Sequence, residues 1–240
     1  MDPARDEILT AYMETYGLTD RDLMEDSASE SAAILAAAAD YHLDRHDAFA
    51  IKPERCALIV IDMQVGFVQH GSAQWIPQAE RLLKPLAEFA DLCRGAGIPV
   101  ILTSANTLNP APNDAQRFIK AMAEGNLGHG SPGLQIMDEL VREGDYLITT
   151  KRTYDSFCGT DLGMQLRSRG RDTIIVTGTM TNYCCEATAR SGFDRGYHVV
   201  FMSDLTATDS AIGHQATLQT MRRGYARVMS RAQLVQELKS

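Results

Sequence analysis

The chain has 240 residues, of which 45% are hydrophobic and 22% are charged, and these values exclude a wholly disordered protein. They are typical of a soluble globular protein with one large domain. The net charge of −8 is unevenly distributed: residues 1–52 hold 12 acidic and 4 basic side chains, and residues 53–240 hold 19 of each. An acidic arm and a neutral body offer no basic surface for nucleic acid or an anionic membrane.

Targeting and metal-binding patterns are absent from the sequence. It contains no run of 18 apolar residues, and its first residues, MDPARDEILTAYMETYGL, lack a basic stretch followed by an apolar core. We therefore expect no membrane span and no leader, and a cytoplasmic location. In that reducing compartment the five cysteines, none of them in a CxxC pair, stay thiols. The scattered histidines predict no metal site, and we expect no cofactor.

The N-terminal arm differs in kind from the rest of the chain. Residues 3–16 and 19–41 have the composition of helices, and residues 44–53 have that of a linker, so we place the domain boundary between residues 52 and 53. Such an acidic helical pair could cap its own subunit, be mobile, or wrap a neighbouring copy. Because it buries little surface by itself, we expect a homo-oligomer, a dimer or tetramer, with the arm at an interface.

Residues 53–240 alternate between short β-rich runs and longer helical patterns. Strands are expected at residues 56–62, 98–103, 145–150, 172–178, 197–204 and 226–230, and helices at 78–94, 114–123, 160–169, 181–195 and 209–223. The strand runs are nearly continuous in apolar residues, as strands covered by helices on both faces are. The pattern predicts an α/β fold with three α-β-α layers around a six-stranded, mostly parallel, Rossmann-like sheet.

Three ionisable side chains follow three of the predicted strands. Asp62 closes the first strand, Lys151 closes the third, and the pair Cys184 and Cys185 comes just after the fourth. Since ligands of open parallel sheets bind outside the carboxyl ends of the strands, we expect an acid, an amine and a thiol at one edge. Neighbouring side chains of a helix point in different directions, so only one cysteine can face this edge; we assign Cys184 to it and Cys185 to packing.

The chemistry of these three groups is coherent. A thiol is a good nucleophile only as a thiolate, so it needs a proton acceptor and positive potential. Asp62 can take the proton, while Lys151 and a helix that begins at Thr181, with Thr181 as N-cap, would favour the thiolate. We therefore expect a lowered pKa for the thiol of Cys184.

These residues resemble the isochorismatase-like cysteine hydrolases, a family that includes nicotinamidases, N-carbamoylsarcosine amidases, biuret hydrolases and ureidoacrylate amidohydrolases. The match covers residues 57–230. Residues 62–67 (DMQVGF) resemble the family's DxQxxF, residues 151–157 (KRTYDSF) resemble its lysine segment, and residues 178–190 (GTMTNYCCEATAR) resemble GxxTNxCVExTAR. The resemblance implies Asp62, Lys151 and Cys184 as a catalytic triad. It also implies a cis peptide bond before Met180 and an oxyanion hole made by the amides of Met180 and Cys184.

The resemblance implies an amidohydrolase that acts on a small molecule. A small amide, imide, ureido or carbamoyl compound would lose its C–N bond through a thioester, with release of ammonia or a small amine. Isochorismatase proper lacks the nucleophilic cysteine, so Cys184 argues for amide hydrolysis. Nicotinamidases carry a metal site with histidines after the second strand, where this chain reads SANTLNPAPND, so the resemblance disfavours nicotinamide.

Five further residues are candidate substrate contacts, although each also has a structural interpretation. The family would place Phe67, Phe157 and Tyr183 near the mouth of the pocket, but aromatic residues are more often core. Asn106, just past the second strand, could orient a polar substrate, and Thr181 could offer a hydroxyl. We assign His214 and Cys158 structural roles, although His214 follows the fifth strand and could reach the same edge of the sheet.

Two other functions stay open at this point. A non-catalytic binding or scaffold protein could keep the same fold and pocket, with the acidic arm as its docking element. A thiol redox sensor could use the adjacent cysteines, although a disulfide between neighbours closes a strained ring.

Overall fold

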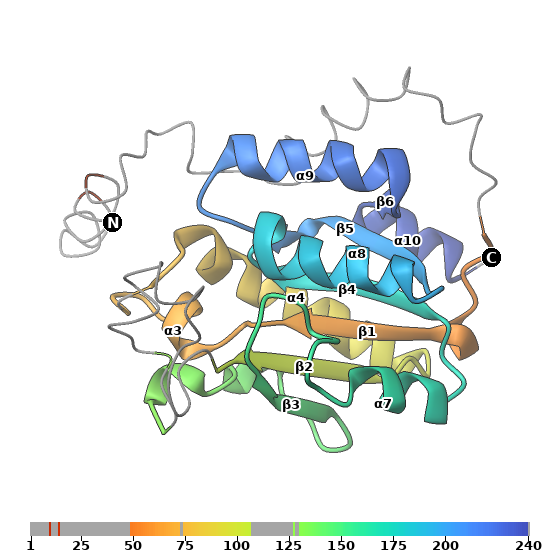
Figure 1. Cartoon of the computed structure of the whole chain (residues 1–240), viewed down its shortest axis with the longest axis horizontal. Helices are drawn as coiled ribbons and strands as arrows, with labels where there is room; N and C mark the ends of the chain where they lie inside the picture. The colour runs from red at the N-terminus through yellow and green to blue at the C-terminus, as the bar shows by residue number, and fades with distance from the viewer. Residues whose placement is uncertain are drawn as a thin grey trace.

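The computed structural model describes Thr10, Glu14, residues 49–72 and 74–106, Leu127 and residues 130–239. Within this part of the chain, six strands form one sheet in the order β3-β2-β1-β4-β5-β6, and every neighbouring pair is parallel (Figure 1). The strands are β1 (Cys56–Ile61), β2 (Val100–Ala105), β3 (Tyr146–Lys151), β4 (Thr173–Thr179), β5 (His198–Ala207) and β6 (Arg227–Met229). All six predicted strands are confirmed, and the sheet expected to be mostly parallel is entirely parallel here.

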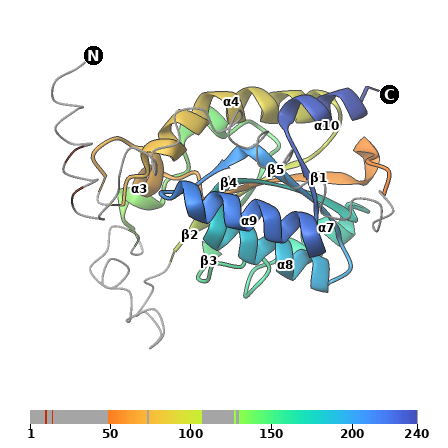
Figure 2. The same ribbon diagram turned by 90° about the horizontal axis from the view of Figure 1, so that it is seen from above.

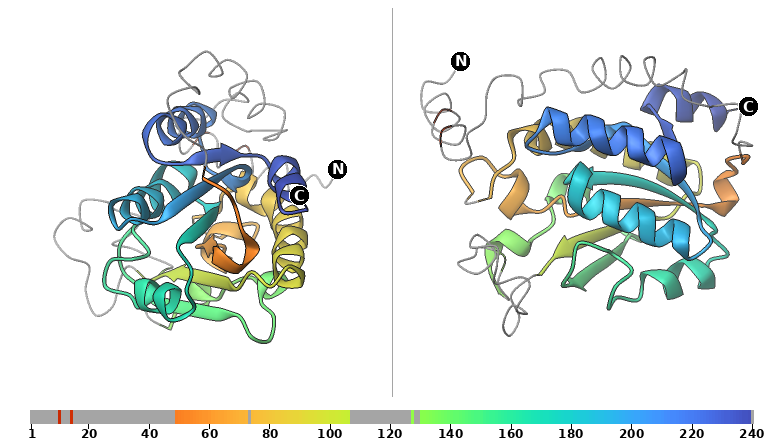
Figure 3. Two further views of the ribbon diagram at one scale, coloured as in Figure 1. Left: turned by 90° about the vertical axis from the view of Figure 1, so that its right-hand side faces the viewer. Right: turned by 45° about the horizontal axis from the view of Figure 1, so that its top comes forward.

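Helices cover both faces of the sheet and make the three expected layers. Figure 2 shows α4 (Pro77–Gly95) and α10 (Arg231–Glu237) on one face, and α7 (Leu162–Ser168), α8 (Glu186–Asp194) and α9 (Ala211–Gly224) on the other; Figure 3 shows the same layers end-on. No helix among the described residues has both the length and the apolar character that a membrane crossing requires. The helices expected at 3–16, 19–41 and 114–123 fall almost wholly outside the described residues.

Two α-helices of the described residues were not predicted from the sequence, and a third, predicted helix begins in a different way. The short helix α3 (Val65–Val68) and helix α10 were not predicted. The helix expected at residues 181–195 begins instead as a five-residue π-helical turn, η5 (Thr181–Cys185), which leads into α8. A π-turn inside a helical pattern is a frequent mark of a functional site.

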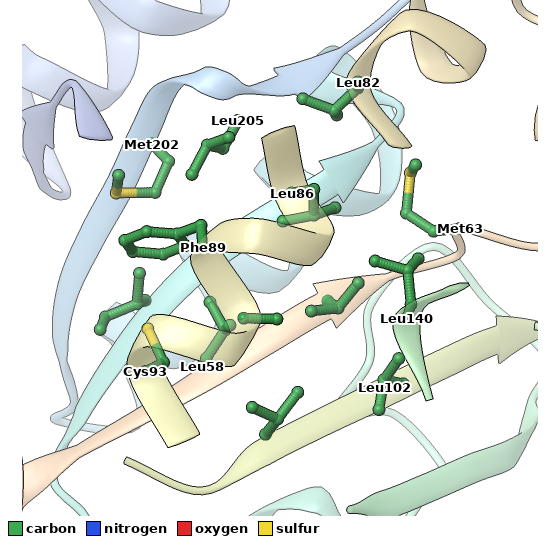
Figure 4. Packing of buried hydrophobic residues seen from close by; sticks show 14 of the residues in the cluster. Leu58, Met63, Leu82, Leu86, Phe89, Cys93, Leu102, Leu140, Met202 and Leu205 are labelled. Carbon is green, nitrogen blue, oxygen red and sulfur yellow. The ribbon is translucent and has the colours of Figure 1, made fainter. Parts of the chain in front are cut away.

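The core explains why the central strands are so apolar. Every residue of β1, β2 and β4 is buried. Successive side chains of a strand point to opposite faces, so Leu58 packs with Leu86 and Phe89 under α4 (Figure 4), while Ile59 packs on the α8 face. Burying a Leu or Phe side chain stabilises a fold by about 1.5–3 kcal/mol. The sheet is thus packed against helices on both of its faces.

The order of the strands reverses between β1 and β4. From β1 the chain runs outward through β2 to β3, and from β4 it runs the other way through β5 to β6. In open parallel sheets such a reversal leaves a crevice at the carboxyl ends of the strands. The two strands approach very closely just before their ends: a Cβ on Gly178 would lie 2.1 Å from the carbonyl oxygen of Ile61. Only glycine fits at position 178, where the two strands lie so close together.

Candidate active site

Asp62 stands directly after β1, in a backbone conformation that few residues adopt. Its φ is 51°, in the left-handed region that Asp and Asn tolerate better than other side chains with a Cβ. Thr103 of β2 holds both its backbone and its side chain: the Asp62 backbone N–H donates to the Thr103 carbonyl at 3.1 Å and to the Thr103 hydroxyl oxygen at 3.2 Å, and the Thr103 hydroxyl donates to Asp62 Oδ1 at 2.6 Å. One carboxylate oxygen is therefore held by the neighbouring strand, and the other can serve a second partner.

Lys151 is the last residue of β3, and its side chain is fully buried. Its Nζ donates to Asp62 Oδ2 at 2.6 Å and to Cys184 Sγ at 3.4 Å. Because β2 lies between β3 and β1 in the sheet, the lysine reaches across the end of a whole strand to meet both partners. The structure thus brings together the acid, the amine and the thiol that the sequence placed at one edge.

Cys184 lies in the π-turn η5, and its side chain differs in surroundings from that of its neighbour. Cys184 is 6% exposed beside Lys151, whereas Cys185 is fully buried with its Sγ 3.8 Å from the Thr177 carbonyl oxygen. This confirms that Cys184 faces the site and that Cys185 packs in the core.

The backbone around this turn is also distinctive. The peptide bond between Thr179 and Met180 is cis. The amides of Tyr183 and Cys185 both donate to the Met180 carbonyl, at 3.1 Å each. The residue before the turn is Met180, so the expectation that Thr181 is the N-cap is wrong: Thr181 is the first residue of the turn, and its hydroxyl pairs instead with His214 Nδ1 at 2.9 Å. The oxyanion hole of Met180 and Cys184 amides stays a prediction.

The electrostatics of the thiol contradict the expectation of a resting thiolate. Burial raises the pKa of the Cys184 thiol to about 12, because the positive charge of Lys151 does not outweigh burial together with the negative charge of Asp62. For Lys151, burial works toward a lower pKa, but the Asp62 carboxylate and the Cys184 sulfur outweigh it, so the pKa is raised. These raised pKa values favour a neutral thiol on Cys184 beside a charged Lys151 ammonium in the free site.

The structure places the five predicted substrate contacts in different surroundings. Asn106 is 8% exposed, and its side-chain Oδ1 has no hydrogen-bond partner among the described residues, while its backbone N–H donates to the Lys151 carbonyl at 2.7 Å. Tyr183 is 44% exposed, and its ring lies 5.5 Å from that of Tyr154. Thr181 is fully buried against His214.

The other two predicted contacts make packing interactions. Phe157 is buried and stacks on Tyr197 with ring centroids 5.4 Å apart, and Phe67 packs against the cluster under α4. Both contacts agree with the core interpretation. The substrate roles of all five residues stay predictions.

Three residues near the site were missed by the sequence analysis or given only a structural role. Thr103 donates a hydrogen bond to the Asp62 carboxylate. It ends a predicted strand, as Asp62 does, so its position in the sequence could have indicated that it lies at the site. Tyr154 lies in the KRTYDSF segment with its ring beside that of Tyr183, and burial together with Cys184 raises the pKa of its phenol. His214 contacts the π-turn from α9, and no local pattern indicates that contact.

No group of three or more His, Cys, Asp or Glu side chains that could hold a metal ion occurs among the residues that the structure describes. A nicotinamidase-type metal site was disfavoured from the sequence because the segment SANTLNPAPND contains no histidine. Most of that segment lies outside the described residues.

The fold and this cluster agree with the comparisons to known proteins. Residues 56–233 match the isochorismatase domain. The chain belongs to the isochorismatase family. It is 35% identical over 181 residues to nicotinamidase 3 of Arabidopsis thaliana, covering 71% of this chain and 82% of that protein. It is 30% identical over 200 residues to the ureidoacrylate amidohydrolase RutB of Methylobacterium radiotolerans, covering 75% and 74%.

A solved structure supports the same assignment. The crystal structure of a cysteine hydrolase from Pseudomonas syringae pv. phaseolicola superposes with a TM-score of 0.74 at 26% sequence identity, covering 80% of this chain and 96% of that chain. Members of the family with these names are hydrolases, some of them acting on amides, so the family that the motifs resemble is confirmed.

Proposed function

We propose that this protein is a cysteine amidohydrolase that cleaves the C–N bond of a small amide, imide, ureido or carbamoyl compound. The observation that carries the proposal is the Lys151 ammonium within 2.6 Å of Asp62 Oδ2 and 3.4 Å of Cys184 Sγ. The names of the two curated relatives, a nicotinamidase and a ureidoacrylate amidohydrolase, support amide hydrolysis as the reaction. A nucleophile, a base and a cation in one buried cluster are what a thiol-dependent acyl transfer requires.

Attack on the substrate begins from a neutral thiol. As a carbonyl carbon approaches Cys184, Asp62 takes the proton from Sγ while the C–S bond forms. The negative charge that develops on the carbonyl oxygen is stabilised by the amides of Met180 and Cys184. Lys151 remains an ammonium throughout and stabilises negative charge in this buried site, on the Asp62 carboxylate before the proton transfer and on the sulfur as it loses its proton.

The second half of the reaction returns the proton. Asp62, now protonated, donates its proton to the nitrogen of the tetrahedral intermediate. The C–N bond then breaks, ammonia or a small amine departs, and the acyl group remains on Cys184 as a thioester. Water then attacks the thioester as Asp62 removes one of its protons. The C–S bond breaks, the sulfur regains the proton, and the carboxylic acid or carbamate is released.

An ammonia-release screen of the wild-type protein tests the proposal. Its compounds are ureidoacrylate, biuret, maleamate, N-carbamoyl amino acids and nicotinamide, which we include because a nicotinamidase is among the relatives. Cyclic imides are tested beside them by mass spectrometry of the ring-opened half-amide, because their ring opening releases no ammonia. The substrate found is then offered to Cys184→Ala, and the matched control is Cys185→Ala at the neighbouring buried thiol. We expect a loss of about 10³-fold or more in the first variant only, as for other covalent nucleophiles.

Trapping of the intermediate gives a second readout. Rapid quenching followed by peptide mass spectrometry is expected to show an acyl group on Cys184 and none on Cys185. Turnover that survives in Cys184→Ala would refute the thioester mechanism. Binding of a screened compound without turnover would instead favour a small-molecule-binding protein.

A further inference from the structure

His214 contacts the turn that carries Cys184, although its own position in the chain is 30 residues further on. It lies on α9, is fully buried, and its Nδ1 is 2.9 Å from the Thr181 hydroxyl oxygen. Its other ring nitrogen, Nε2, is 3.1 Å from the carbonyl oxygen of Ser203 in β5. The imidazole therefore connects the first residue of η5 to the body of the sheet.

The chemistry of the partners fixes the direction of both hydrogen bonds. A carbonyl oxygen can only accept, so Nε2 of His214 carries the proton and donates to Ser203. Nδ1 is then the acceptor, and the Thr181 hydroxyl donates to it. Burial lowers the pKa of His214 to about 4, so the ring keeps this neutral form at neutral pH. Thr181 is consequently held in one orientation.

A second contact ties the next residue of the turn to the same region. The Thr208 hydroxyl donates to Asn182 Oδ1 at 2.6 Å. At the start of α9, a Cβ on Gly213 would lie 2.9 Å from Asn182 Nδ2, so the glycine allows the close approach. The first two side chains of η5 are thus held by Thr208, just after β5, and by His214 in the first turn of α9.

We propose that His214 is a positioning residue for Cys184: through the Thr181 hydroxyl it sets the place of the π-turn, and hence the distance of Sγ from Lys151 and Asp62. The 3.4 Å contact between Lys151 Nζ and Sγ leaves little margin, since a displacement of about 1 Å would separate the sulfur from its partners. Misplacement of that size commonly costs about 10²-fold in rate. Only the catalytic consequence rests on the function proposed above; the positional effect does not.

The test measures the reactivity of Cys184 without any substrate. Each variant is treated with iodoacetamide at pH 8, and peptide mass spectrometry gives the labelling rate of Cys184 relative to that of the exposed Cys158 on the same chain. His214→Asn keeps an acceptor near Nδ1, His214→Gln keeps a donor near Nε2, and His214→Leu keeps neither. We expect the ratio to fall about tenfold or more in the Leu and Gln variants and to be restored in the Asn variant.

Thr181→Val removes the hydroxyl that donates to His214 and serves as the second arm. It is expected to lower the labelling ratio as His214→Leu does. In the double variant Thr181→Val, His214→Leu the ratio is expected to be no lower than in either single variant. This arm also decides the outcome if a His214 variant does not fold.

Three results would overturn the proposal. One is a ratio within twofold of the wild type in both His214→Leu and Thr181→Val. Another is equal ratios in His214→Asn and His214→Gln. The third is faster labelling of Cys184 together with the buried Cys185, which would mean that His214 keeps the turn folded rather than placing the sulfur. The labelling ratio can be measured even if the protein hydrolyses no compound in the screen. The positioning role of His214 and the proposed hydrolase activity can therefore be refuted independently.

Discussion

The ion pair between Lys151 and Asp62 is buried completely, with both side chains 0% exposed, and its removal gives the sharpest test of the site's energetics. Lys151→Met keeps most of the side-chain volume but takes away the ammonium. The Asp62 carboxylate is then left inside the protein without its counter-charge, although Thr103 still donates to Oδ1. Breaking a buried pair from one side costs about 3–5 kcal/mol, because an uncompensated charge stays buried.

That loss is large enough to measure directly. For a protein of this size it corresponds to a fall of about 6–20 °C in melting temperature. Urea unfolding followed by far-UV circular dichroism at pH 7.5 gives the free energy of unfolding. The matched control is Glu88→Gln, which breaks an ion pair with Arg231 whose side chains are 57% and 42% exposed. That change is expected to cost about 1 kcal/mol at most.

The double variant Asp62→Asn, Lys151→Met separates the effect of charge from that of packing. It leaves no buried charge, and asparagine tolerates the φ of 51° at position 62. We expect it to be more stable than Lys151→Met, while both variants lose hydrolysis. The reasoning is refuted if Lys151→Met unfolds within about 1 kcal/mol of the wild type, or if the double variant is no more stable than the single one.

Gly178→Ala is expected to abolish soluble expression, because the new Cβ would lie 2.1 Å from the Ile61 carbonyl oxygen, whereas Gly144→Ala, also at positive φ but with nothing within 4 Å, is expected to cost only about 1 kcal/mol in urea unfolding; equal effects would contradict this. Because the pKa of His214 falls from 6.5 to about 4 on folding, the unfolded chain binds the extra proton between these values, and the free energy of unfolding is expected to decline by up to about 3 kcal/mol from pH 6.5 to pH 4. A His214→Gln variant with the same pH slope as the wild type would argue against it. Because the pKa of Cys184 is raised to about 12, its labelling by iodoacetamide is expected to rise about tenfold per pH unit between about pH 7 and 10; a plateau below about pH 8 would instead reveal a resting thiolate.

Most strands and helices of the described residues could be predicted from the sequence, because their patterns are local in the chain. Strands covered on both faces are nearly continuous in apolar residues, so β1 appears as the run CALIVI and β4 begins around the run IIV. Helix α10 was missed, although Ser230 and Gln233 form a capping box that marks its start. Helix α3 has four residues, too few for any periodic pattern.

The sequence by itself also determined which reactive groups meet. Parallel strands bring their carboxyl ends to one edge, so the positions of Asp62, Lys151 and Cys184 after their strands were enough to predict the cluster. What they could not determine is the protonation state of the thiol. That state depends on how burial weighs against two opposite charges a few ångströms away, and burial is known only once the layers have packed.

The tertiary structure alone decided the partner of Thr181. Sequence reasoning made it a helix cap, because hydroxyl side chains often bind the amides that follow them. In the fold its hydroxyl instead donates to His214, 33 residues away, which α9 brings over the π-turn. Contacts between residues so far apart leave no periodic signature in the chain, since they depend on how separate helices and strands come to lie against one another.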